Sequence, residues 1–299
     1  MQLRRYAFGA MGGPCELKLY GALAELVDRV AETAIAEVRR LERKYSRYRD
    51  DSLTTAINRR AGDRCGIEVD PETAGLLDYA DTCFRQSGGL FDITSGVLRE
   101  VWDFRSGRVP TPGELDAVRR RVGWQRVRWE RPRLVLAEPE MQLDFGGLVK
   151  EYAVDRCAER CRALGIHHGL VDLGGDLATI GPHPDGKPWI VGIRDPRRPH
   201  TALASVPVAR GGIASSGDYE RFMTVDGVRY GHILDPRTGW PVAGLAGVSV
   251  IAPRCLIAGT ASTIAMLKGE RDGAAWLDEL GLANLRVTHS GDVSGTIAS

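Results

Sequence analysis

Hydrophobic and polar residues alternate near the start of the chain and then change to a helical spacing. Cys15, Leu17 and Leu19 are separated by polar residues, which is the pattern of a strand with one buried face. Between residues 23 and 45, apolar side chains recur at steps of three and four, with charged residues between them. This spacing predicts an amphipathic helix directly after the strand.

The same patterns predict the later elements. We expect helices over residues 71–85, 148–164, 256–267 and 274–280, a hairpin over 126–137, and strands over 170–173, 189–193, 204–208, 222–225, 248–251 and 285–288. Strands and helices do not alternate strictly, so the pattern favours an α+β fold over a doubly wound parallel sheet.

Composition and charge restrict the class of protein. The 299 residues are 43% hydrophobic and 26% charged, as in a soluble globular protein, and the formal charge of +1 provides no global field for nucleic acid or an anionic membrane. No segment approaches the roughly 18 apolar residues of a membrane span, and the first residues do not form a signal peptide. We therefore expect a cytoplasmic protein with a small-molecule partner, no nucleic-acid partner and no membrane insertion. The six cysteines contain no CxxC pair and are expected to be free thiols.

Glycine is the one unusual component. The chain has 36 glycines, about 12% against a usual share of about 7%, and they include five Gly-Gly pairs beside polar or aromatic residues. Gly146-Gly147 precedes a predicted helix with Lys150 in its first turn, an arrangement that could cradle a phosphate through free N–H groups and the helix dipole. It is not a P-loop, because GxxxxGK[ST] is absent.

His232 is the histidine with the most suggestive neighbours. It lies between Gly231 and the turn sequence that begins at Asp235, and it could act as a base or a positioning donor near neutral pH. A loop histidine bonded to the backbone would have the same sequence context, so both interpretations remain open.

Seven motifs, taken together and in order, carry a resemblance to a known family. They are Met11-Gly12, Ser46-Arg-Tyr48 with Asp51-Ser52 and Asn58, Phe91-Asp-Ile-Thr94 before Trp102, Asp144-Phe-Gly-Gly-Leu-Val-Lys150, Val171-Asp-Leu-Gly-Gly175, Ser215-Ser-Gly-Asp218 and His232-Ile-Leu-Asp-Pro-Arg-Thr-Gly239. In this order they closely resemble the FAD:protein FMN transferase (ApbE-like) family, from about residue 11 to residue 269. The resemblance implies one domain over residues 1–299, an α+β, T-fold-related structure with mixed, largely antiparallel sheets and flanking helices.

The resemblance also implies an activity and a set of site residues. The expected reaction transfers the FMN part of FAD to a threonine or serine hydroxyl of an acceptor flavoprotein, releases AMP and needs Mg²⁺. FAD would contact Met11, Tyr48, Leu90, Phe91, Asp92, Asp144, Lys150 and Ile233. The carbonyl of Gly147 and the hydroxyl of Thr263 fall at the metal position. His232, near the phosphates, is the candidate for accepting the proton of the acceptor hydroxyl, with Lys150 as the second catalytic candidate.

The chain departs from the family pattern at the metal. Gly259 stands where the family has an aspartate ligand, Glu151 replaces the glycine after the lysine, and Gly13 replaces a threonine. Thr260 or Ser262 could supply an oxygen but no charge. Adjacent positions on a helix face different ways, so we expect Glu151 to point away from the face of Lys150 and not to restore the site. The missing charge motivates two alternatives, a flavin-binding protein without transferase activity and a Mg²⁺-dependent FAD pyrophosphatase.

Overall fold

The computed structural model describes residues 1–198 and 201–297 of the chain. Its helices are α1 (Ala24–Tyr45), α2 (Leu53–Asn58), α3 (Pro71–Gln86), α4 (Pro112–Arg119), α5 (Val149–Ala163) and α6 (Cys255–Leu280), with short 3-10 helices η1 (Ser95–Glu100) and η2 (Trp124–Arg126). Its strands are β1 (Gln2–Ala10), β2 (Gly13–Gly21), β3 (Ile67–Glu68), β4 (Val127–Glu130), β5 (Arg133–Leu136), β6 (Gly169–Leu173), β7 (Asp176–Gly181), β8 (Trp189–Arg194), β9 (Ala202–Val208), β10 (Gly212–Gly217), β11 (Phe222–Val225), β12 (Val228–Gly231), β13 (Leu245–Ala252), β14 (Ala283–Thr288) and β15 (Val293–Ser294).

An eight-stranded antiparallel sheet forms the centre of the molecule, in the order β1-β2-β6-β7-β10-β13-β14-β15. β2 alternates as the sequence predicts, with Cys15, Leu17 and Leu19 buried between more exposed neighbours. β13 is instead buried at nearly every position, because helices cover one face of this part of the sheet and other strands cover the opposite face.

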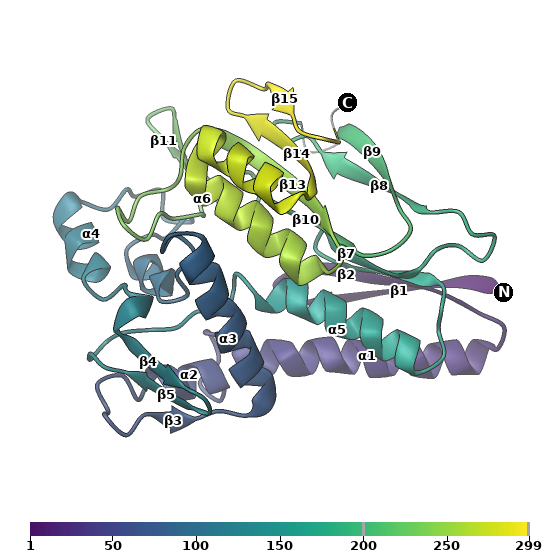
Figure 1. Ribbon diagram of the computed structural model, residues 1–299, viewed down its shortest axis with the longest axis horizontal. Coiled ribbons are helices and arrows are strands. Elements are labelled where there is room, and N and C mark those ends of the chain that lie inside the picture. Colours follow the sequence, from purple (N-terminus) through teal and green to yellow (C-terminus); the bar gives the residue numbers. More distant parts are fainter. Residues whose placement is uncertain (199–200, 298–299) are drawn as a thin grey trace.

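The long helices α1, α5 and α6 form a layer on one face of the sheet (Figure 1). Their apolar side chains meet those of β2, β6, β10 and β13 in the main core. On the other face the hairpin of β8 and β9 packs through Val191, Ile193 and Val206 against Leu285 and Val287 of β14. α6 has a break at Gly269, where φ is +80°, which matches the two separate helices predicted for this segment.

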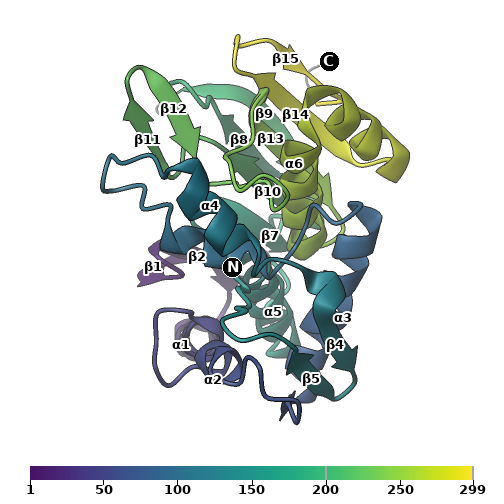
Figure 2. The same ribbon diagram turned by 90° about the vertical axis from the view of Figure 1, so that its left-hand side faces the viewer.

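A second group of elements lies at one end of the helical layer. It contains α2, α3, α4 and the small sheet β3-β5-β4 (Figures 1 and 2). The indole N–H of Trp102 donates to the carbonyl of Gly239 at 2.7 Å, and its ring packs against Tyr230 and Trp240. These contacts join the η1 region to the segment that carries the His232 motif.

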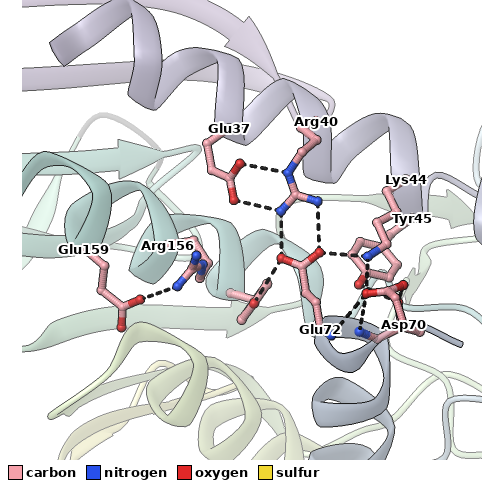
Figure 3. A network of polar contacts seen from close by, with 10 residues as sticks. Glu37, Arg40, Lys44, Tyr45, Asp70, Glu72, Arg156 and Glu159 are labelled. Carbon is pink, nitrogen blue, oxygen red and sulfur yellow. Dashed lines mark hydrogen bonds and ion pairs between the residues drawn. The ribbon is translucent and has the colours of Figure 1, made fainter. Parts of the chain in front are cut away.

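A network of ion pairs and hydrogen bonds fixes α1, α3 and α5 relative to one another (Figure 3). Glu72 of α3 accepts two hydrogen bonds from Arg40 and one from Lys44, both on α1, and one at 3.2 Å from the Tyr152 hydroxyl on α5. Lys44 also bonds Asp70 at 2.8 Å. The ends of these helices, including the first turn of α5, are therefore held by charge as well as by the core.

The structure confirms the α+β class with mixed helices and antiparallel sheets. The predicted hairpin is β4 and β5, and all six cysteines are free thiols. Sequence patterns missed the helices α2 and α4 and the strands β1, β3, β7, β10, β12 and β15. Among the described residues, no helix combines the length and apolarity that a membrane crossing requires. The domain extent 1–299 and the cytoplasmic location remain predictions.

Candidate active site

The predicted site residues gather where the first turn of α5 meets α6 and two strands of the central sheet. Lys150 lies in that first turn, and Asp176 is the first residue of β7. Gly259 and Thr263 are one turn apart on α6. Lys150 Nζ lies 2.8 Å from Asp176 Oδ2, and the Thr263 hydroxyl lies 2.8 Å from that of Ser216 on β10. The fold therefore brings together motifs that are more than 100 residues apart in sequence.

Lys150 is a charged group held at a helix N-terminus. Burial by itself would lower the pKa of its ammonium group, but the charges of Asp176 and Glu151 outweigh burial and raise it. Asp176 is almost fully buried, and its Oδ1 also accepts a hydrogen bond from the backbone N–H of Ser215 at 3.3 Å. Lys150 thus stays protonated and adds to the positive end of the α5 dipole.

The position of Glu151 corrects the sequence-based expectation that it faces away from the site. A β-carbon added to Gly259 would lie 2.5 Å from Glu151 Cγ and 2.9 Å from Glu151 Oε1. The side chain of Glu151 therefore points at α6 and fills the space next to Gly259. Burial and the neighbouring charge of Asp176 raise the pKa of Glu151. The expectation failed because it considered only α5, whereas the long side chain reaches across to the next helix.

Three hydroxyl groups lie next to Gly259 or one turn after it on α6. The Ser216 hydroxyl is 2.8 Å from the hydroxyls of both Ser262 and Thr263, and Ser262 donates to the carbonyl of Gly259 at 2.9 Å. Glu151 Oε2 is sealed from solvent and has no hydrogen-bond partner. The fold thus places several neutral oxygens and one unpartnered carboxylate oxygen close together.

This donor set fits a hard divalent cation. No group of three or more His, Cys, Asp or Glu side chains that could hold a metal occurs among the described residues, so a cation here would depend largely on hydroxyl and carbonyl oxygens. Oxygen ligands are what Mg²⁺ prefers, and Glu151 offers a carboxyl oxygen beside Asp176. Gly147 lies four residues before Glu151, and a β-carbon added to it would lie 3.6 Å from the ring of Phe91. The roles of Gly147 and Thr263 as metal ligands stay predictions.

Asp144 fixes the loop that precedes α5. Arg47 donates to Asp144 Oδ2 at 2.9 Å and to the carbonyl of Gly96 at 2.7 Å, while the N–H of Gly146 donates to Asp144 Oδ1 at 2.8 Å. A β-carbon at Gly96 would lie 2.4 Å from Asp144 Cβ, so only glycine allows this approach. The carboxylate therefore orients the Gly146-Gly147 turn, and a direct contact between Asp144 and FAD remains a prediction.

His232 lies in a positively charged environment. Burial lowers the pKa of its imidazole to about 4, and the guanidinium groups of Arg99 and Arg221 and the ammonium of Lys150 act in the same direction. His232 Nδ1 is buried without a hydrogen-bond partner. Neither guanidinium group forms an ion pair with a carboxylate of residues 1–198 or 201–297. Two guanidinium groups without a directly paired carboxylate, beside a neutral imidazole, are chemistry that suits an anion.

The loop over residues 90–92 is well packed. Leu90, Phe91 and Asp92 are all buried. Asp92 Oδ1 accepts from the N–H and hydroxyl of Thr94, at 2.7 and 2.6 Å, and Oδ2 accepts from the N–H of Trp124 at 3.0 Å. Asp92 thus holds the loop that presents Phe91 to Gly147. The contacts of these three residues with FAD stay predictions.

The remaining predicted residues lie around the same region. Met11 adopts φ +54° in the turn between β1 and β2, and its N–H donates to Glu42 at 2.6 Å. Gly12 follows with φ +78°, and a β-carbon there would lie 3.3 Å from an Arg221 nitrogen, so this turn adjoins the cationic group. Tyr48 is 80% exposed, with the Arg47 guanidinium 5.9 Å from the centre of its ring, so much of the ring surface is open for stacking. Ile233 is half-buried directly after His232.

A separate cavity of about 550 Å³ lies next to the strand that leads to His232. Tyr230 and Trp240 line it, together with Asp218, which pairs with Arg197 at 2.7 Å and His289 at 3.1 Å. None of the predicted FAD or metal residues lines this cavity. We therefore place the candidate site around Lys150, where the predicted residues lie, and not in this cavity.

Sequence reasoning missed three site residues. Arg99 on η1 and Arg221 between β10 and β11 come from distant segments, so no local pattern could pair them. Asp176 had a signal, because it directly follows the pair Gly174-Gly175. Glu151 was noticed but placed on the wrong side.

Comparison with known proteins agrees with this geometry. The model of the ApbE family matches residues 11–285. A protein of Treponema pallidum named FAD:protein FMN transferase is 32% identical over 289 residues, covering 90% of this chain and 80% of its own. The crystal structure of the ApbE protein of Thermotoga maritima superposes with a TM-score of 0.91 at 29% identity, covering 99% of this chain and 97% of that one. The apo flavinyl transferase ApbE of Pseudomonas stutzeri gives 0.87 at 31%, with 99% and 95% covered. The chain therefore belongs to the ApbE family.

Proposed function

We propose that this protein transfers FMN from FAD to a threonine or serine hydroxyl of an acceptor flavoprotein, in a Mg²⁺-dependent reaction that releases AMP. The hydroxyl oxygen of the acceptor forms a new bond to the flavin-side phosphorus of FAD. The bond from that phosphorus to the bridging oxygen breaks, and the bridging oxygen leaves with AMP. The hydroxyl proton passes to a base on the protein.

The arrangement around His232 carries the proposal. Its imidazole is neutral near pH 7, since its pKa is lowered to about 4, and a neutral imidazole can accept a proton. Arg99, Arg221 and Lys150 provide positive charge beside it. That charge suits a pyrophosphate, whose non-bridging oxygens gain negative charge during transfer. Positioning and charge neutralisation suffice for this chemistry without a covalent enzyme intermediate.

Two groups of residues divide the work. Lys150 and the two arginines would hold the pyrophosphate, while Glu151, Thr263 and the Gly147 carbonyl offer oxygens to the cation. Mg²⁺, when bound, would neutralise phosphate oxygens and help the AMP group leave. Asp144 and Asp92 hold the two loops in place through the hydrogen bonds described above. Tyr48 offers an exposed aromatic face to a ring of FAD.

A product assay tests the proposal against its alternatives. The protein is incubated with FAD, Mg²⁺ and a flavoprotein domain that carries an acceptor threonine, and both AMP and acceptor-bound flavin fluorescence are followed. We expect AMP and a fluorescent acceptor, and neither product after chelation with EDTA. AMP without labelled acceptor would identify an FAD pyrophosphatase. Bound FAD with neither product would identify a flavin-binding protein and contradict both enzymatic interpretations.

The proposal includes a cytoplasmic location, as predicted from the sequence. Cell fractionation followed by detection of the protein tests it. Recovery of the protein outside the cytoplasmic fraction would contradict the location.

A further inference from the structure

Gly259 and Glu151 occupy one volume between α5 and α6. A β-carbon at residue 259 would lie 2.5 Å from Glu151 Cγ, 2.9 Å from Cδ and 2.9 Å from Oε1. Contacts that short do not occur between real side chains, so no larger residue fits at 259 while Glu151 keeps its position. The carboxylate of Glu151 thus lies where a short side chain from α6 would otherwise place its own carboxylate.

The environment of the Glu151 carboxylate lacks a hydrogen-bond donor for one oxygen. Oε2 is sealed from solvent and has no partner among the described residues, and a buried charged oxygen in that state is unfavourable unless it is protonated or meets a cation. The neighbouring ammonium group of Lys150 is bound at 2.8 Å by Asp176. Glu151 also interacts with Asp176 and with the Lys150 ammonium group, so one ammonium group faces two carboxyl groups and leaves a negative charge that a divalent cation would neutralise.

The neighbouring oxygens are arranged for such a cation. Thr263 is one turn after Gly259 on α6, on the same side of the helix. Its hydroxyl is already oriented by Ser216 at 2.8 Å. Gly147 lies in the turn before α5, four residues before Glu151. The two predicted neutral ligands therefore lie about one turn from Gly259 on α6 and one turn from Glu151 on α5.

We propose that Glu151 supplies the anionic ligand of the divalent cation from α5, in place of a carboxylate at residue 259 on α6. Where the family has glycine on α5 and aspartate on α6, this chain has Glu151 on α5 and Gly259 on α6. The acidic side chain has therefore moved from α6 to α5. The inference rests on the metal site of the proposed function. It also reverses the expectation from the sequence that Glu151 does not restore the site. Gly259→Asp alone would place a second side chain in an occupied volume and should not strengthen metal binding.

Metal affinity, measured apart from the reaction, tests the proposal. Mn²⁺ replaces Mg²⁺ as an EPR probe and is titrated alone and with saturating ADP, which carries a pyrophosphate. We expect Glu151→Gln, which keeps the shape and removes the charge, to weaken Mn²⁺ binding about tenfold or more. Glu159→Gln is the matched control on the same helix, because Glu159 lies two turns after Glu151 and pairs with Arg156 (Figure 3) and with Arg254, the residue before α6, and the Mn²⁺ dissociation constant of this variant should not change.

The double variant Glu151→Gly with Gly259→Asp tests the exchange itself. It should recover Mn²⁺ affinity to within about threefold of the original protein, whereas Gly259→Asp alone should lower Tm and bind no more tightly. An unchanged dissociation constant in Glu151→Gln would overturn the proposal, as would a double variant that folds but does not bind Mn²⁺. Absence of Mn²⁺ binding to the original protein, with and without ADP, would overturn it too.

Failure of this inference and failure of the proposed function give different results. A protein that labels its acceptor while Glu151→Gln leaves Mn²⁺ affinity unchanged retains the function and loses the inference. A protein that binds Mn²⁺ through Glu151 but labels no acceptor retains the inference and loses the function.

Discussion

The protonation of His232 gives the sharpest physical prediction about the site. Burial, with Arg99, Arg221 and Lys150, lowers the pKa of the imidazole from 6.5 to about 4. That difference corresponds to about 3 kcal/mol between the two protonation states. At pH 7 only about one molecule in a thousand would carry the charged imidazole, so the free protein presents a proton acceptor and not a donor.

The sign of the effect on stability follows from the same values. Between pH 6.5 and about 4, the unfolded chain binds a proton at this histidine and the folded chain does not, so stability falls as the pH falls. We expect a loss of about 1 to 2 kcal/mol between pH 7 and pH 5 from this residue, allowing for its partial exposure. His232→Gln should lack that loss, which urea unfolding at the two pH values measures.

NMR of ring-labelled histidines measures the titration directly. The chain has six histidines, and the spectrum of His232→Gln assigns the resonance of His232. We expect an apparent pKa of about 4 in the free protein and a clear rise when pyrophosphate is added, because an anion between Arg99 and Arg221 stabilises the charged imidazole. A resonance that titrates near 6.5 without ligand, or one that pyrophosphate does not move, would refute this account of the cationic site.

Three further predictions concern binding and stability. Arg99→Gln should weaken FAD binding about tenfold with little change in Tm, measured by quenching of flavin fluorescence, and an unchanged affinity would remove Arg99 from the site. Lys150→Met should lower Tm because it leaves Asp176 buried without its partner, and it should lower FAD affinity because it removes a phosphate-binding charge. Adding Asp176→Asn should recover Tm but not FAD affinity. Recovery of both would contradict a phosphate-binding role for Lys150. Glu72 has a pKa lowered to about 2, because its bonds to the α1 cations outweigh burial. Its contribution, about 1 to 2 kcal/mol after discounting for solvent screening, is present above pH 4.5 and is lost as the pH falls towards 2. Glu72→Gln should therefore destabilise the protein at pH 7 but hardly at pH 2, and an equal effect at both would show that the network is not electrostatic.

The sequence predicted those elements whose pattern is local. The amphipathic period of α1 and the alternation of β2 were visible because one face of each is buried and the other is not. β10 was missed because its Gly-Ile-Ala-Ser-Ser-Gly sequence has no alternation, and its strand conformation comes from pairing with β7 and β13. Strand pairing between distant segments is a tertiary effect that local propensity does not record.

The site shows the same division. Lys150 at the start of a helix was visible as an anion-binding feature, and the motifs located most other candidates. The direction of Glu151 was predicted wrongly, because it depends on a glycine 108 positions later in the chain that leaves space on another helix. Arg99 and Arg221 come together only through the packing of η1 beside the turn before β11, so a single sequence gives no reason to pair them.

The mass of an acceptor protein tests the central claim most directly. A flavoprotein domain with one acceptor threonine is incubated with this protein, FAD and Mg²⁺, and its intact mass is measured together with the AMP released. The account predicts a mass gain of one FMN less one water, in equal amount to AMP, and no gain when the acceptor threonine is replaced by alanine. An acceptor of unchanged mass, with or without AMP, would contradict it.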